Sequence, residues 1–296
     1  MIERFNFYDV YGYLLPGLVL IAIIWLPFGI IQHTWPTAEL ASAIIALALA
    51  YVAGHLVQTV ATNAIPSEVA DPTGRRRFPH DLFLDKENQR FSTSFKEKLA
   101  QRVQAAFGLE LAVDRQADEE ISRTRQDAFL ECRSFLIRKE AATYAEQFEG
   151  LYAMMRGLGV VFALGSLYLG GWAASIKKYD CLRVSAVVVL WLSVAILLAT
   201  AVIRMMRGSR DPNRARMDRI TLGAWAMGAL AVGYLCGWDR VNEVRAVMTL
   251  VGVALLCVFA ALRFFVSYRF FAEKFADTVW RDFAATVSTA VADGNA

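Results

Sequence analysis

The chain has 296 residues, is 56% hydrophobic and 20% charged, and has a formal net charge of +3. Its three histidines are too few for a His-rich metal site, and its four scattered cysteines argue against a disulfide framework or a zinc site. The charges are unevenly placed: none lies between Asp9 and Glu39, and none between Glu39 and Glu68. An uncharged run of about 18 or more apolar residues can cross a bilayer, and there it must be helical to pair its backbone polar groups.

Six apolar runs meet this criterion and predict an all-α integral membrane protein with a six-span helical bundle. The fifth run is short and rich in glycine, so a four-span core with the last pair of runs peripheral is the alternative. The first run is longer than the apolar part of a signal peptide and contains Pro16 and Pro27, so we expect a retained span. The runs are Val10–Ile31, Leu40–Val60, Gly157–Ala174, Val184–Ile203, Ile220–Trp238 and Ala246–Leu262.

Basic residues in short loops predict which side of the membrane each loop occupies. The loop from Arg204 to Arg219 holds six arginines and two aspartates, whereas residues 32–39 contain no Lys or Arg. This pattern predicts that both termini, residues 61–156 and the arginine loop are cytoplasmic. The loop at residues 175–183, with three basic residues, is mild evidence against this arrangement.

The first run is entered through NFYDVYGYLLPG, residues 6–17. Its tyrosines predict an aromatic anchor at the interface, and Pro16 with Gly17 permits a kink after the helix has entered the membrane. An anchored entry helix is the simplest interpretation.

Polar side chains share one face of the second run: Tyr51, His55, Gln58 and Thr62 follow i, i+4, i+7, i+11 spacing. Polar groups inside a membrane usually face the bundle or a water-filled cavity. Tyr51, His55 and Gln58 are therefore candidates for lining a pore or the bundle. Gln58 and Thr62 are close enough to the end of the run to be interfacial. His55 lies deeper and is expected either to bond a neighbouring helix or to act in gating.

Residues 61–156 form the only sizeable polar segment and predict a cytoplasmic helical domain without a sheet. The segment opens with a proline-rich linker that contains His80, which is expected to be solvated. An amphipathic helix should then begin at Ser94, whose spacing to Glu97 fits a capping box, and end at Gly108.

A second cytoplasmic helix is expected to begin near Asp118. No proline occurs between it and the third apolar run. We therefore expect this helix to continue into the membrane without a break.

After the sixth run, residues 264–283 keep an apolar stripe on one helical face. The sixth span is predicted to continue as an amphipathic helix whose stripe packs on the helices of residues 95–150 or on a second subunit. Four segments result: a two-span hairpin at 1–60, the cytoplasmic domain at 61–156, a four-span membrane region at 157–262 and the C-terminal helix and tail at 263–296.

Clustered arginines predict contact with anionic lipid headgroups, where each basic residue contributes about 1 kcal/mol. Nucleic-acid binding is not favoured, because aromatic residues are not interleaved with these arginines. The headgroup candidates are Arg75, Arg76, Arg77, Arg204, Arg207, Arg210, Arg214, Arg216 and Arg219.

Small residues at a spacing of four let membrane helices approach each other closely. Two such stripes predict tight packing within the bundle or between protomers. They are Ser166, Gly170 and Ala174 on the third run, and Ala229, Gly233 and Gly237 on the fifth.

No P-loop, H-E-x-x-H or G-x-S-x-G motif is present in the sequence. No set of acid, base, nucleophile or metal ligands is visible either. The sequence therefore predicts a protein that is not an enzyme and needs no cofactor.

Three segments carry a family resemblance: FYDVYGYLLPGL (7–18), AGHLVQ (53–58) and YAEQFEGLYAMMRGL (144–158). They resemble a loose group of uncharacterised bacterial multi-pass inner-membrane proteins, some of which look like the membrane effectors of antiphage systems. The resemblance implies a bacterial inner-membrane location and brings no catalytic residues.

The leading functional hypothesis is an oligomeric channel-like or membrane-perturbing effector that is controlled through its cytoplasmic helices. The expected partners are anionic lipid, further copies of the chain and a cytoplasmic protein or nucleotide ligand. A membrane scaffold that docks a soluble partner and a small-solute transporter are the alternatives.

Overall fold

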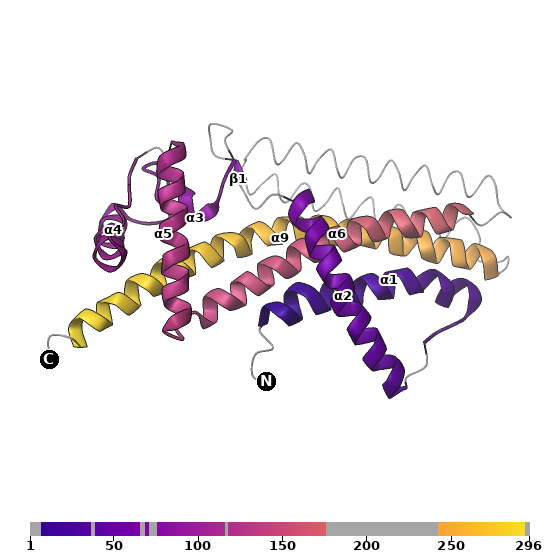
Figure 1. Ribbon diagram of the computed structural model, residues 1–296. Helices are drawn as coiled ribbons and strands as arrows, with labels where there is room; N and C mark the ends of the chain where they lie inside the picture. The colour runs from indigo at the N-terminus through magenta and orange to yellow at the C-terminus, as the bar shows by residue number, and fades with distance from the viewer. Residues whose placement is uncertain are drawn as a thin grey trace. The chain divides into compact units, whose positions relative to one another are not determined.

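The computed structural model describes residues 7–36, 39–65, 69–70, 76–115, 118–175 and 242–293 (Figure 1). These residues are helical except for connecting segments and one short antiparallel pairing of β1 (Val69–Ala70) with β2 (Arg76–Arg77). The helical fold class predicted from the sequence is therefore confirmed for this part of the chain. The helices are α1 (Leu15–Gln32), preceded by a π-helical turn at Asp9–Leu14, α2 (Leu40–Ala64), α3 (Pro79–Leu82), α4 (Thr93–Phe107), α5 (Glu119–Arg138), α6 (Thr143–Ser175) and α9 (Asn242–Asp293).

Four of these helical stretches are long and apolar enough to cross a membrane, and they contain the first, second, third and sixth predicted runs. Their presence is what a membrane protein requires. The predicted runs at Val184–Ile203 and Ile220–Trp238 lie outside the described residues. The four stretches are Asp9–Gln32, Leu40–Ala64, Thr143–Ser175 and Ala246–Val287.

The described residues divide into two units. The apolar unit contains those of Tyr11–Asn63 and Met154–Val266, and the charged unit contains those of Met1–Val10, Ala64–Ala153 and Ser267–Ala296. Helices α6 and α9 each contribute residues to both units. In this division the C-terminal part of the chain from Ser267 shares a unit with residues 64–153.

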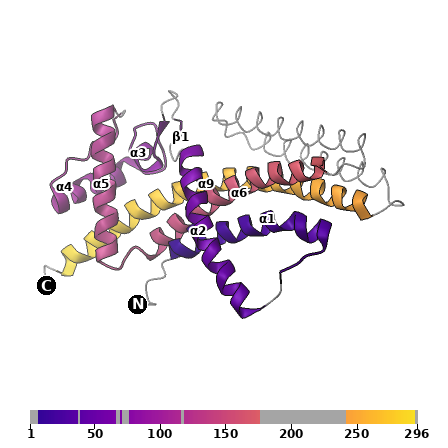
Figure 2. The ribbon, with the colours of Figure 1, turned by 45° about the vertical axis from the view of Figure 1, so that its right-hand side comes forward.

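In the apolar unit, α1, α2, α6 and the first part of α9 share one apolar core. The chain of α2 crosses that of α1 (Figure 2). Further along α1, the hydroxyl of Tyr168 on α6 donates a hydrogen bond of 3.0 Å to the carbonyl of Ile24. The buried residues of the core include Ile23, Val57, Val161, Leu169, Leu250, Ala254 and Cys257.

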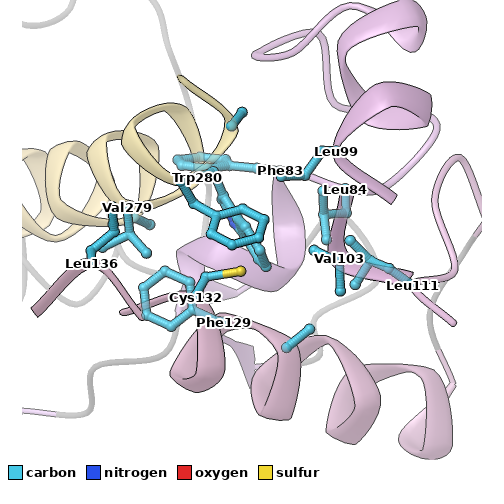
Figure 3. Packing of buried hydrophobic residues seen from close by; sticks show 14 of the residues in the cluster. Phe83, Leu84, Leu99, Val103, Leu111, Phe129, Cys132, Leu136, Val279 and Trp280 are labelled. Carbon is cyan, nitrogen blue, oxygen red and sulfur yellow. The ribbon is translucent and has the colours of Figure 1, made fainter. Parts of the chain in front are cut away.

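In the charged unit, the last part of α9 packs against α3, α4 and α5 (Figure 3). Trp280 is fully buried, and its indole N–H donates a 3.2 Å hydrogen bond to the carbonyl of His80. The apolar stripe of the C-terminal helix therefore has an intramolecular partner, which is one of the two outcomes expected. The core around Trp280 includes Phe83, Leu84, Leu99, Val103, Phe129, Cys132, Leu136, Val279 and Phe283.

The ends of α4 and the start of α5 follow from short side chains and one glycine. Ser92, not Ser94, caps α4, and its hydroxyl accepts from the Phe95 N–H at 3.3 Å. Gly108 ends α4 in the left-handed conformation, as predicted. Asp118 caps α5 by accepting from the Ile121 N–H at 2.8 Å, at the position near which a helix was predicted to begin.

The expectation of one unbroken helix from Asp118 into the membrane is wrong, because α5 ends at Arg138 and α6 begins at Thr143. Glu140 adopts φ 56°, and the Ala141 N–H donates back to the carbonyl of Leu136 at 2.9 Å. This is the hydrogen-bond pattern of a Schellman C-cap, which usually carries glycine at the left-handed position. With glutamate there, the sequence gives no stop signal.

Replacing Glu140 by glycine should stabilise the protein by about 1 kcal/mol, because a left-handed backbone costs roughly that much for a residue with a Cβ. The matched control is Lys139→Gly, since Lys139 has φ −91° and gains nothing from glycine. Thermal unfolding of the purified protein in detergent measures both. A lower melting temperature for Glu140→Gly than for the unsubstituted chain would contradict the assignment of this cap.

Candidate functional site

Pro16, the second residue of α1, leaves a backbone acceptor without its usual donor. In an α-helix the carbonyl of residue 12 would accept from the N–H of residue 16, but proline has no N–H. The side chain of Gln58 on α2 supplies the missing donor: its Nε2 donates to the carbonyl of Gly12 at 2.6 Å. Both Gly12 and Gln58 are buried. A gap in one helix is therefore closed by a side chain from the next.

The Gly12 carbonyl belongs to the π-helical turn Asp9–Leu14. Such turns accommodate about one extra residue and frequently occur at functional sites. The wider turn also relieves the clash that a proline ring makes with the carbonyl four residues before it. The π-turn, Pro16 and the Gln58 hydrogen bond are thus one connected feature.

The two helices approach closely enough here for their backbones to touch. A Cβ on Gly54 would lie 1.9 Å from the carbonyl oxygen of Tyr13, and one on Gly17 would lie 1.8 Å from that of Ala50. No side chain can occupy either position while the helices cross at this distance. The crossing therefore depends on glycine in both helices.

A third helix, α6, reaches the same place. A Cβ on Gly157 would lie 2.6 Å from Nε2 of Gln58 and 3.2 Å from Cγ of Pro16. The preceding residue, Arg156, is 7% exposed, and its Nη2 is 3.5 Å from Oε1 of Gln58. We call Gly12, Pro16, Gln58, Arg156 and Gly157 the polar junction.

The two neighbours of Gln58 fix the direction of its amide. A carbonyl can only accept, and a guanidinium can only donate. With Nε2 toward Gly12 and Oε1 toward Arg156, the amide satisfies both. A carboxylate or an apolar group of the same shape could not do this.

The structure distributes the predicted polar face differently from the expectation. Gln58, a bundle-lining candidate expected to lie close to the end of the run, is 5% exposed and central to the junction. His55, expected to be the deep residue, is exposed, and its ring stacks on Tyr13 at 3.8 Å between centroids and 21° between planes. Tyr51 is half-buried, and its ring makes an edge-to-face contact with that of His55, with 4.8 Å between the ring centroids. His55 is thus part of an aromatic cluster on the outside of the α1–α2 crossing.

Only some of the remaining packing and headgroup candidates lie among the described residues. Ser166 and Gly170 are buried and Ala174 is half-buried, a placement that suits a packing face. Arg76 lies in β2. Outside the described residues lie Arg75, Arg204, Arg207, Arg210, Arg214, Arg216, Arg219, Ala229, Gly233 and Gly237.

In the charged unit, Arg77 has a different role from the predicted headgroup contact. It is 7% exposed, its Nε donates to Asp81 at 2.7 Å, and its Nη1 donates to Asp85 at 2.5 Å. Arg125 on α5 is fully buried and pairs with the same two carboxylates, at 2.9 Å and 2.6 Å. Two cations and two anions therefore form a compact network, and Arg77 is held within it rather than at a lipid surface.

The network is hydrogen-bonded beyond its four charges. Ser122 donates to Asp81 at 2.6 Å, and Arg125 also donates to the backbone carbonyl of Ala112 at 2.8 Å. Burial by itself would raise the pKa of Asp81, but the bonds from Arg77, Ser122 and Arg125 outweigh it and lower that pKa. Asp81 therefore stays ionised and holds α3 to α5.

His80 is buried rather than solvated. Its ring stacks between Phe129, at 4.2 Å, and Phe78, at 5.4 Å, and in the described part of the chain its Nε2 has no hydrogen-bond partner. Burial lowers the pKa of His80 to about 4, although the charge of neighbouring Asp81 acts in the opposite direction. The residue is a neutral aromatic spacer beside Trp280.

These arrangements hold neighbouring helices together. Within the described residues no group of three or more His, Cys, Asp or Glu side chains could hold a metal ion. Sequence reasoning missed Arg156, Asp81 and Arg125. The signal for Arg156 was present, since it is a lone cation directly before the third apolar run.

Comparisons with protein-family models, with curated proteins and with solved structures find no match to this chain. Its function is therefore inferred from its own geometry.

Replacing Arg125 by methionine should destabilise the charged unit by about 3–5 kcal/mol, because it leaves buried carboxylates with too little positive charge. Arg123→Met is the matched control: Arg123 pairs with Glu119 on the same helix, but both are exposed, and such pairs contribute little. Denaturant unfolding followed by tryptophan fluorescence compares the two. Equal losses for both variants would contradict the role given to the network.

His80 should make the protein less stable in mild acid. Its pKa falls from an ordinary 6.5 to about 4 on folding, so the unfolded chain takes up the proton first. Stability is complete above pH 6.5 and declines as the pH falls toward 4, by on the order of 3 kcal/mol. His80→Phe should remove this decline, and His33→Phe, at an exposed site, should not. Unfolding curves from pH 7 to 4.5 measure it, and an unchanged slope in His80→Phe would contradict the assignment.

Proposed function

We propose that the chain is a non-enzymatic membrane effector whose apolar unit acts as a channel-like or membrane-perturbing element under the control of its charged unit. The observation that carries this proposal is the double membership of α9. Leu250, Ala254 and Cys257 of this helix lie in the core of the apolar unit. Val279, Trp280 and Phe283 lie in the core of the charged unit. We take this helix, which contributes residues to both cores, as the path by which the charged unit would act on the apolar unit.

The polar junction supports a moving part in the membrane. Burying an amide and a guanidinium among apolar helices is costly, and such groups usually mark a functional position. Gln58 and Arg156 lie where α1, α2 and α6 come together. A change in the position of α6 would act directly on this contact.

Self-association is the second part of the proposal. The C-terminal stripe no longer argues for it, because that stripe is covered within the chain. Self-association would instead use the outer face of α2. This face exposes a row of large apolar side chains that lipid or a second copy must cover. They include Leu40, Ile44, Ile45, Leu49, Val52 and Leu56. We place the protein in the bacterial inner membrane with both termini in the cytoplasm, where a protein or nucleotide ligand would act on the charged unit.

A membrane scaffold is the second candidate. On α5, Leu130 and Ile137 are 47% and 41% exposed and lie seven residues apart on one face. Two apolar side chains so placed on a helix fit a helical partner. In this alternative the charged unit docks a soluble protein, and the apolar unit serves as its anchor.

Reconstitution into vesicles that contain anionic lipid tests the effector proposal. Trp280→Ala should loosen α9 from the charged unit and change dye release or conductance by about five- to a hundredfold, the range of ordinary coupling energies. Phe270→Ala is the matched control, because Phe270 lies on the same helix and is 55% exposed.

A bilayer that stays tight with the unsubstituted chain and with Trp280→Ala, at every voltage applied, would contradict the effector proposal. The scaffold alternative predicts this tight bilayer together with a stoichiometric co-purifying protein that is lost on Leu130→Ser. These readouts separate the two candidates.

A further inference from the structure

The entry turn of the first span has a built-in hinge. Because Pro16 cannot donate to the Gly12 carbonyl, one rung of the helical hydrogen-bond ladder is missing between residues 12 and 16. Helices bend at such positions. The segment before Pro16, which includes the π-helical turn Asp9–Leu14, can therefore pivot against the rest of α1.

One side chain from outside α1 occupies the missing rung. Nε2 of Gln58 is 2.6 Å from the Gly12 oxygen, and α2 itself is held in place at the Gly54–Tyr13 contact. While that bond is made, the entry turn is fixed to α2. When it is broken, the Gly12 carbonyl loses this donor, and Pro16 cannot replace it.

We propose that Gln58 is a releasable latch on this hinge, so that the Gln58–Gly12 hydrogen bond sets whether the entry turn of the first span is fixed or free to swing. Arg156 adjusts the latch, since it faces the other end of the same amide at 3.5 Å. A displacement of α6 that moves Arg156 changes the orientation of the Gln58 amide. The latch rests on the geometry of the junction, and only its use as a gate rests on the proposed function.

A double-substitution cycle tests the latch. Gln58→Met keeps the shape of the side chain and removes the donor, and Pro16→Ala returns an N–H to position 16. Gln58→Met alone should lower the melting temperature by about 3–6 °C. It should also speed amide exchange in residues 7–15 by about five- to a hundredfold. In the Pro16→Ala background both effects should fall by half or more, because the Gly12 carbonyl then has a donor in its own helix.

Pro27 provides the matched control. It lies in the same helix and is buried, and the carbonyl it leaves unpaired belongs to Ile23 rather than to Gly12. In a Pro27→Ala background, Gln58→Met should keep its full effect. If Pro16→Ala and Pro27→Ala reduce the effect of Gln58→Met equally, or neither reduces it, the latch is overturned.

Gln58→Glu serves as a second variant should Gln58→Met fail to fold. It retains the acceptor toward Arg156 and loses the donor toward Gly12, so it should show the same dependence on Pro16. Dye release from vesicles separates the latch from the gate. If dye release changes with Gln58→Met and returns to the level of the unsubstituted chain with the added Pro16→Ala, the result supports both the latch and the gate. Coupled stability without any release in any variant supports the latch and contradicts the proposed function.

Discussion

A buried polar atom is costly to leave without a partner, and this constraint organises both units. In the apolar unit the atom is the Gly12 oxygen, which Pro16 cannot serve and which Gln58 does. In the charged unit it is the carboxylate of Asp81, which Arg77, Ser122 and Arg125 surround. Leaving such a group unpaired costs about 1–3 kcal/mol, and more if it is charged, which is comparable with a large part of a protein's net stability. Helices that supply these partners are therefore held in place more firmly than apolar contact alone would require.

The two networks differ in how easily they can change. In the charged network each of two cations lies within about 3 Å of both carboxylates, and removing any member leaves an uncompensated buried charge. The junction depends on one neutral amide that can rotate, and the hinge beneath it is already missing a hydrogen bond. The charged network is therefore the more rigid of the two contacts, and helix α9 contributes residues to both cores.

Local rules in the sequence predict the helices of this chain well and their buried polar contacts poorly. The start of α5 near Asp118 and the end of α4 at Gly108 could be read directly, because these signals involve neighbouring residues only, although the cap of α4 is Ser92 rather than Ser94. The stop at Glu140 could not, because the residue type that usually marks a left-handed cap is absent. The contact of Asp81 with Arg125 joins residues 44 positions apart, and no periodicity reveals such a pair. The sequence places His55 deeper in the second run than Gln58, but position along one helix does not decide burial. Burial depends on which face of the helix its neighbours cover.

Proline in an apolar helix nevertheless gives a readable signal for such contacts. It marks the carbonyl four residues earlier as an acceptor that lacks its helical donor. A lone glutamine on the adjacent span can supply a side-chain N–H to it. Gly12, Gln58 and Gly157 each lie in one of the three segments on which the family resemblance was based, residues 7–18, 53–58 and 144–158. These segments contain the donor, the acceptor and the proline whose missing N–H leaves that acceptor unpaired within its own helix. They also contain the glycines that let the backbones meet. What they have in common in this chain is therefore a three-helix contact, the one on which the proposed latch depends.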